Sequence, residues 1–150
     1  MRTYRRSKKN GTRRKKRAAH SLDAFQQEIV VMFLEMLMMV KLYHWKTTSY
    51  ATHKATDELH SKLHTNVDAF VEILLGKSGA RMDLTGRKHV KLVDLSSADT
   101  LKQEVDRFKR YLVGLNDHPA LRSMSNTDLF SIRDTILGDL NQFLYLLTFR

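Results

Sequence analysis

Four long segments of this chain repeat apolar residues at the spacing of an α-helix, and the sequence holds a single proline. Apolar residues at i, i+3, i+4 and i+7 line one face of a helix. Helices are predicted over about 22–46, 49–75 and 98–115, and from just after Ser125 almost to Arg150. Because one proline and six glycines in 150 residues leave few helix breakers, the predicted fold class is all-α.

The connections between these segments predict the topology. Residues 47–49 form a very short link, so the first two helices should make an antiparallel hairpin. The link over 77–95 could span over ~60 Å at ~3.3 Å per residue, whereas a helix of about 27 residues is only ~40 Å long. Two helical hairpins joined by one long crossover are the ferritin-like four-helix bundle. Gly138 in the last helix further suggests a close helix–helix contact.

Basic charge is concentrated at the start of the chain. Residues 1–17 hold ten of the 26 Lys and Arg residues and none of the 16 Asp and Glu residues, so residues 18–150 carry no formal net charge. We expect a flexible tail over 1–19 that stays disordered until it meets an anion, followed by the bundle over 20–150. The predicted nucleic-acid-binding residues are Arg2, Arg5, Arg6, Lys8, Lys9, Arg13, Arg14, Lys15, Lys16 and Arg17.

Several classes of protein and site are excluded at this stage. The chain has no cysteine, so any metal must be bound by histidine and carboxylate. The basic start is not followed directly by an apolar stretch with a cleavage site, so we expect no secretory signal and an intracellular protein. The apolar run over 29–43 is too short to span a membrane, and Glu35 and Lys41 interrupt it.

The second predicted helix carries a stripe of metal-ligating residue types. At 100° per residue, its six members lie within an arc of about 120° beside the apolar face. Such a half-buried band requires partners for its polar groups, although a row of His and Asp is also typical of a solvated helix face. The stripe consists of His53, Asp57, His60, His64, Asp68 and Glu72.

Spacing divides this stripe into two half-sites. His53 and Asp57 are one turn apart, as are Asp68 and Glu72, but the midpoints of the pairs are about fifteen residues or ~22 Å apart. Metal–ligand bonds are only about 2 Å long, so the pairs can share an ion only across a two-fold axis. His44, just across the short link, could complete the first half-site.

These residues resemble the signature of the Dps mini-ferritins. Leu42-Tyr43-His44-Trp45 is similar to the family's His-Trp end of the first helix, and Asp57, Asp68 and Glu72 follow His53 at the family's offsets of 4, 15 and 19. The resemblance covers about 22–150 and extends to Dps-like proteins of large DNA viruses. The nine-residue interval from His44 to His53 is shorter than usual in the family and lacks its glycine.

The resemblance implies a ferroxidase site with iron as the ion. His44, His53 and Asp57 would come from one subunit and Asp68 and Glu72 from its two-fold mate. Outside the family's pattern, His60 and His64 add nitrogens on the same face and are either extra ligands or packing residues. It also implies a homo-oligomer, a dodecamer in the family, that sequesters iron and protects DNA.

Two alternatives stay open at the sequence level. The chain could be a nucleic-acid-condensing or virion structural protein that keeps the fold without ferroxidase activity. The basic run over 13–17 is also typical of a nuclear localisation signal, so a nucleoid, a nucleus and a virion are all candidate locations. We favour non-specific DNA contact, because ten uncompensated charges give a large counterion-release contribution.

Overall fold

The computed structural model describes the backbone of residues 4–87 and 89–149 and the side chains of residues 22–87 and 89–149. Within these ranges all regular structure is helical, which confirms the all-α prediction. The helices are α1 (Tyr4–Lys46), α2 (Tyr50–Ser78), α3 (Ala98–Gly114) and α4 (Thr127–Leu146), with two 3-10 turns, η1 (Leu115–Asp117) and η2 (Pro119–Leu121), between α3 and α4.

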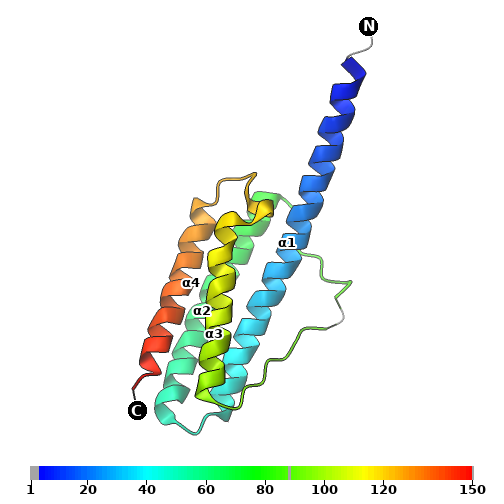
Figure 1. Cartoon of the computed structure of the whole chain (residues 1–150). Coiled ribbons are helices and arrows are strands. Elements are labelled where there is room, and N and C mark those ends of the chain that lie inside the picture. Colours follow the sequence, from blue (N-terminus) through cyan, green and yellow to red (C-terminus); the bar gives the residue numbers. More distant parts are fainter. Residues whose placement is uncertain (1–3, 88, 150) are drawn as a thin grey trace.

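The helices form two hairpins connected by one long link. Figure 1 shows α1 and α2 running in opposite directions on either side of the turn over 47–49. The link over 79–97 then returns along the length of the bundle, so that α3 starts at the same end as α2 and runs in the same direction, in contact with α1 and α4. Helix α4 runs back antiparallel to α3 and packs against α2.

Local chemistry sets where the helices around the site begin and end. The Ser49 side chain accepts a hydrogen bond from the Thr52 amide and caps the start of α2. Helix α2 ends at Ser78, and Gly79 follows in the left-handed conformation with φ 69°. The C-cap of α2 is therefore Gly79, whereas the sequence predicted that this helix ends near Gly76. Lys77 Nζ lies 2.8 Å from Asp128 and ties this end of α2 to the first turn of α4.

Helix α1 begins much earlier than the sequence predicts. The expectation was a disordered tail over 1–19 and a helix from about residue 22, but the backbone is helical from Tyr4. Lys, Arg and Ala, which dominate residues 13–19, all have high helix propensity. Because adding residues to an existing helix avoids the cost of nucleation, the helix over 22–46 can extend through this segment despite its like charges. In Figure 1 this part of α1 projects beyond the other helices.

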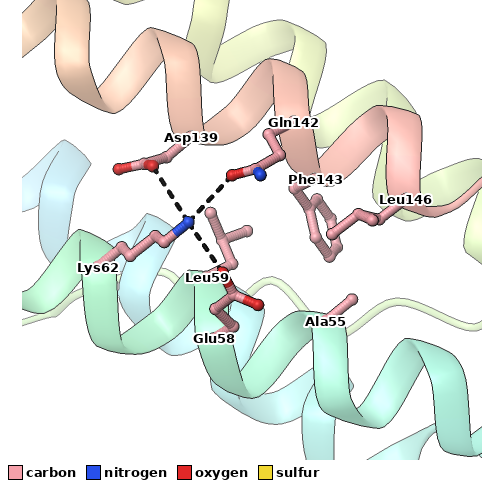
Figure 2. Close-up of a pocket in the computed structure, with 8 residues that line it drawn as sticks. All are labelled: Ala55, Glu58, Leu59, Lys62, Asp139, Gln142, Phe143 and Leu146. Carbon is pink, nitrogen blue, oxygen red and sulfur yellow. Dashed lines mark hydrogen bonds and ion pairs between the residues drawn. The ribbon is translucent and has the colours of Figure 1, made fainter.

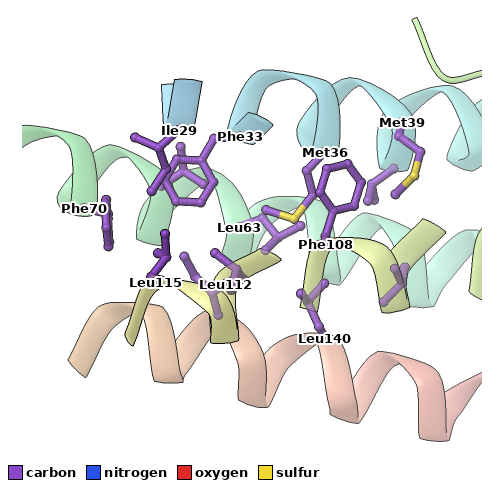
Figure 3. Packing of buried hydrophobic residues seen from close by; sticks show 14 of the residues in the cluster. Ile29, Phe33, Met36, Met39, Leu63, Phe70, Phe108, Leu112, Leu115 and Leu140 are labelled. Atoms are coloured by element: carbon purple, nitrogen blue, oxygen red, sulfur yellow. The ribbon is translucent and has the colours of Figure 1, made fainter. Parts of the chain in front are cut away.

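The core lies along the centre of the bundle and joins all four helices. Figure 3 shows Phe33 and Phe70 meeting edge to face, with ring centroids 5.3 Å apart, while Met36 and Leu63 fill the neighbouring space. The apolar stripe predicted for α3 is buried throughout, and most of the stripes predicted for α2 and α4 are buried. The members of these two stripes that are only partly buried are Val71, Ile132, Leu144 and Leu147. Each fully buried Leu or Phe contributes roughly 1.5–3 kcal/mol through the hydrophobic effect. This apolar core therefore fixes which face of α2 points outward.

Gly138 does not have the role that the sequence suggested. A Cβ atom built at this position in α4 would meet no heavy atom within 4 Å. The predicted close helix–helix contact is therefore wrong, and the glycine lies on an exposed face.

None of the helices in the described ranges combines the length and the apolar character that a membrane span requires.

Candidate metal centre

The short turn between α1 and α2 brings His44 and His53 together. His44 lies in the last turn of α1 and is buried, with 7% of its surface exposed, and His53 lies in the first turn of α2 and is half-buried. Their rings are stacked, with centroids 3.9 Å apart and an interplanar angle of 24°. The three-residue turn leaves no room for these two helix ends to separate, and the two histidines therefore face each other.

Each histidine is held by the backbone of the other. His44 Nδ1 lies 3.0 Å from the His53 carbonyl oxygen, and His53 Nδ1 lies 3.1 Å from the His44 carbonyl oxygen. A carbonyl oxygen can only accept a hydrogen bond, so both Nδ1 atoms must carry the proton and donate. In the neutral imidazole this leaves the lone pair on Nε2 of both rings. Metal-ligating histidines are typically oriented in this way by a backbone carbonyl.

Thr56 supports the same tautomer of His44. Its side chain is fully buried, and Oγ1 lies 3.3 Å from His44 Nδ1. The Thr56 hydroxyl is placed to donate to the Thr52 carbonyl at 2.8 Å or the His53 carbonyl at 3.0 Å. Its oxygen lone pairs therefore remain available to accept from His44. The sequence did not identify Thr56, although a threonine one turn after His53 on α2 could have suggested it.

Asp57 is the third member of this cluster. Its Oδ1 lies 3.9 Å from His44 Nε2 and 3.7 Å from Lys41 Nζ, and 56% of its side chain is exposed. Two ligands bound to one ion at about 2 Å each can be no more than ~4 Å apart. The free nitrogen of His44 and the carboxylate of Asp57 thus have a separation that one ion could bridge.

Asp68 and Glu72 lie away from this cluster on the same helix. Both are exposed and sit more than two turns beyond His60. Within a single chain, the described side chains contain no group of three or more His, Asp or Glu residues that could hold a metal ion. Of the predicted site residues, the structure stacks His44 on His53 and places Asp57 3.9 Å from His44 Nε2, and it leaves Asp68 and Glu72 apart from them.

His60 and His64 occupy the middle of the stripe. His60 is half-buried and His64 is exposed. Burial lowers the pKa of His60 below its ordinary value, and the nearby charges of Lys41 and His64 lower it further. At neutral pH the His60 ring is therefore uncharged, with a nitrogen lone pair available.

The stripe continues onto α1 as a partly apolar surface, which we call the α1–α2 face. On α1 it comprises Leu34, Met38, Lys41 and Trp45, at spacings of three or four residues. Leu34 is 39% exposed and Trp45 is 69% exposed, with Lys41 Nζ 5.9 Å from the Trp45 ring centroid. The Lys41–Asp57 contact joins this part to the stripe on α2. Large apolar groups gathered on one exposed face are typical of an interaction surface.

A second polar cluster, between α2 and α4, was not anticipated from the sequence. Asn66 donates a hydrogen bond to Asp139. Lys62 Nζ lies 2.9 Å from Glu58 Oε1 and 3.0 Å from Gln142 Oε1 (Figure 2). The i,i+4 spacing of Glu58 and Lys62 was a readable signal, but the partners on α4 required the fold. The cavity that these residues line measures only ≈ 10 Å³. The cluster therefore joins two helices and has no room for a ligand.

The ten predicted nucleic-acid-binding side chains of residues 1–17 lie outside the described side chains.

Comparison with known proteins gives one match. A family model described as "Family of unknown function (DUF5856)" matches residues 44–147, from His44 through most of α4. No curated protein and no solved structure matches the chain.

The electrostatic environment of His60 yields a first prediction. Lys41→Met removes the charge that ranks second among the causes lowering the His60 pKa. The pKa of His60 should rise in this variant, yet stay below the ordinary value of about 6.5 because the burial remains. Titration of the histidine ring protons by NMR measures the shift. Lys54→Met, an exposed lysine on α2, serves as the control and should leave His60 unchanged. A His60 pKa that falls or does not move in Lys41→Met contradicts the assignment.

Proposed function

The chain belongs to this family, DUF5856, and we propose that it is a Dps-like mini-ferritin that oxidises Fe²⁺ at a site shared by two subunits. Iron is its substrate, which the protein sequesters after oxidation. A basic N-terminal segment binds DNA non-specifically and keeps the protected nucleic acid close to the site of oxidation.

The reciprocal hydrogen bonding of His44 and His53 is the observation that carries this proposal. It fixes the tautomer in which both Nε2 atoms are free to bind a metal. Imidazole and carboxylate together suit Fe²⁺, since imidazole binds iron well and carboxylate suits harder ions. A histidine on a solvated surface is not expected to be buried like His44, or to be held by a hydrogen bond to a backbone carbonyl as both rings are.

The topology supports the ferritin-like part of the proposal. Two antiparallel hairpins joined by one crossover that runs the length of the bundle are the arrangement of ferritin-like bundles. Within the bundle, the α1–α2 face is the surface that carries the ligand stripe and exposed apolar groups. We place the two-fold partner on this face.

Antiparallel pairing of α2 with its copy completes the site. A two-fold axis reverses the direction of α2, so the end of the stripe with His53 and Asp57 meets the opposite end of the partner's stripe. The partner would supply Asp68 and Glu72, which are exposed and one turn apart. Each dimer then holds two equivalent sites of two imidazoles and three carboxylates. Lys41, which faces Asp57 in the single chain, must give way to the ion.

In such a site the protein supplies binding, orientation and charge. Bound iron gives up one electron to an oxidant, and the three carboxylates stabilise the more highly charged product. The His44 and His53 carbonyls keep both rings in place while the charge of the ion changes.

Removal of two carboxylates tests the site directly. Asp57→Asn with Glu72→Gln should abolish Fe²⁺ oxidation, whether O₂ or H₂O₂ is the oxidant, because each ion loses one carboxylate from each subunit. Both side chains are exposed, so folding stability should change by no more than about 1 kcal/mol. Stopped-flow absorbance follows the oxidation, and circular dichroism follows the helix content.

Asp23→Asn with Asp117→Asn provides the matched control, since both residues are exposed and lie outside the stripe. This control should oxidise iron at the wild-type rate. Wild-type rates in the Asp57/Glu72 variant would rule out the site. They would favour the alternative, a DNA-condensing or virion structural protein without ferroxidase activity.

DNA binding is assigned to residues 1–17, which hold ten basic and no acidic residues, whereas the remainder of the chain has no formal net charge. If about six to eight phosphates are neutralised per engaged segment, log K should fall with log salt at a slope of roughly −5 to −7. Deletion of residues 1–17 should eliminate binding at moderate salt. Iron oxidation should persist, because every proposed ligand lies at or beyond His44.

Fluorescence anisotropy with two unrelated duplexes measures the affinity and its sequence dependence. Replacement of every arginine in 1–17 by lysine retains the charge and should retain most of the affinity. Full affinity in the truncated protein would show that the segment is instead a localisation signal or an assembly element.

A further inference from the structure

The centre of the ligand stripe holds two histidines that the proposed iron site does not use. His60 and His64 are one turn apart on α2, so their Cβ atoms lie on the same side of the helix, about 5–6 Å apart. The Nδ1 atoms of His44 and His53 donate to backbone carbonyls, whereas within the described part of the chain neither the His60 ring nor the His64 ring has a hydrogen-bond partner. Both residues border the α1–α2 face, where the charge of Lys41 lowers the pKa of His60.

The register of the proposed dimer places these histidines at its axis. Matching His53 and Asp57 to the partner's Glu72 and the partner's Asp68 puts the centre of the pairing between residues 62 and 63. Measured along the axis of helix α2, His60 and the partner's His64 then differ in height by one residue, or ~1.5 Å. The same holds for His64 and the partner's His60. Four imidazoles therefore converge on the two-fold axis, midway between the two iron sites.

We propose that His60 and His64 from two subunits form a four-imidazole site on the two-fold axis that binds one divalent transition-metal ion such as Zn²⁺. This inference rests on the dimer of the proposed function. Zn²⁺ prefers four ligands in a tetrahedral arrangement and binds imidazole nitrogen at ≈ 2.0–2.1 Å. One ion on a two-fold axis uses the same pair of ligands from each subunit, as tetrahedral symmetry allows.

The chemistry of this site differs from that of the flanking iron sites. It offers nitrogen ligands alone, whereas each iron site combines imidazole with carboxylate, and nitrogen ligands favour later metals such as Zn²⁺ over Fe²⁺. The uncharged state of His60 at neutral pH leaves a lone pair free for the ion. An ion bound by both subunits would also stabilise the dimer.

Cobalt titration tests the stoichiometry and the geometry together. The full-length Asp57→Asn, Glu72→Gln protein is titrated with Co²⁺, so that the iron sites do not compete. We expect the strong visible absorption of tetrahedral Co²⁺ to saturate at one ion per two chains. Adding His60→Gln and His64→Gln should remove this absorption, while adding His89→Gln, an exposed histidine in the 79–97 link, should not.

Two outcomes overturn the inference. Saturation at one ion per chain would show that the pair binds within a single helix. Absence of any absorption that depends on His60 and His64 would show that the two histidines hold no ion. As a second readout, Zn²⁺ should lower the dimer dissociation constant at least tenfold in sedimentation experiments, and this effect should vanish in His60→Gln, His64→Gln.

The rate of Fe²⁺ oxidation distinguishes failure of the axial site from failure of the proposed ferroxidase function. The His60→Gln, His64→Gln protein should oxidise Fe²⁺ at close to the wild-type rate, because neither residue is assigned to the iron site. If wild-type protein binds one tetrahedral Co²⁺ per two chains but oxidises no iron, the proposed ferroxidase function fails and the axial site stands. If it oxidises iron and no half-equivalent site is found, the axial site fails alone.

Discussion

The paired hydrogen bonds between His44 and His53 are the interaction on which the candidate site depends. They join the last turn of α1 to the first turn of α2 across a three-residue link and fix the tautomer of both rings. The three-residue link keeps the two histidines adjacent, with their ring centroids 3.9 Å apart. Burial of His44 and Thr56 then holds this arrangement in place while Asp57 stays open to solvent.

Much of the fold could be predicted from the sequence because its apolar residues recur at helical spacing. The stripe of α3 and most of the stripes of α2 and α4 are buried as expected, and the long link over 79–97 makes the single crossover. The start of α1 and the role of Gly138 could not be predicted in this way. Helix extension depends on nucleation from the segment that follows, and the space around a glycine depends on how neighbouring helices pack.

The candidate site shows the same division between what spacing determines and what packing determines. Spacing alone separated the His53 and Asp57 pair from Asp68 and Glu72, because helix geometry fixes distances along an axis. Spacing could not show the exchange of carbonyl contacts, the contribution of Thr56 or the Lys41–Asp57 contact, since these depend on how α1 approaches α2. Nor could it reveal the polar cluster of Lys62 and Asp139, which forms only when α4 packs on α2.

A shared site between two subunits is the central claim, and mixing two inactive variants tests it most directly. One chain lacks His53 and Asp57, and the other lacks Asp68 and Glu72. After subunit exchange, half of the dimers should be mixed and each should regain one intact site of two, giving about a quarter of the wild-type Fe²⁺ oxidation rate per chain. Native mass spectrometry verifies the exchange. Mixed dimers that form and oxidise no iron would contradict the shared site.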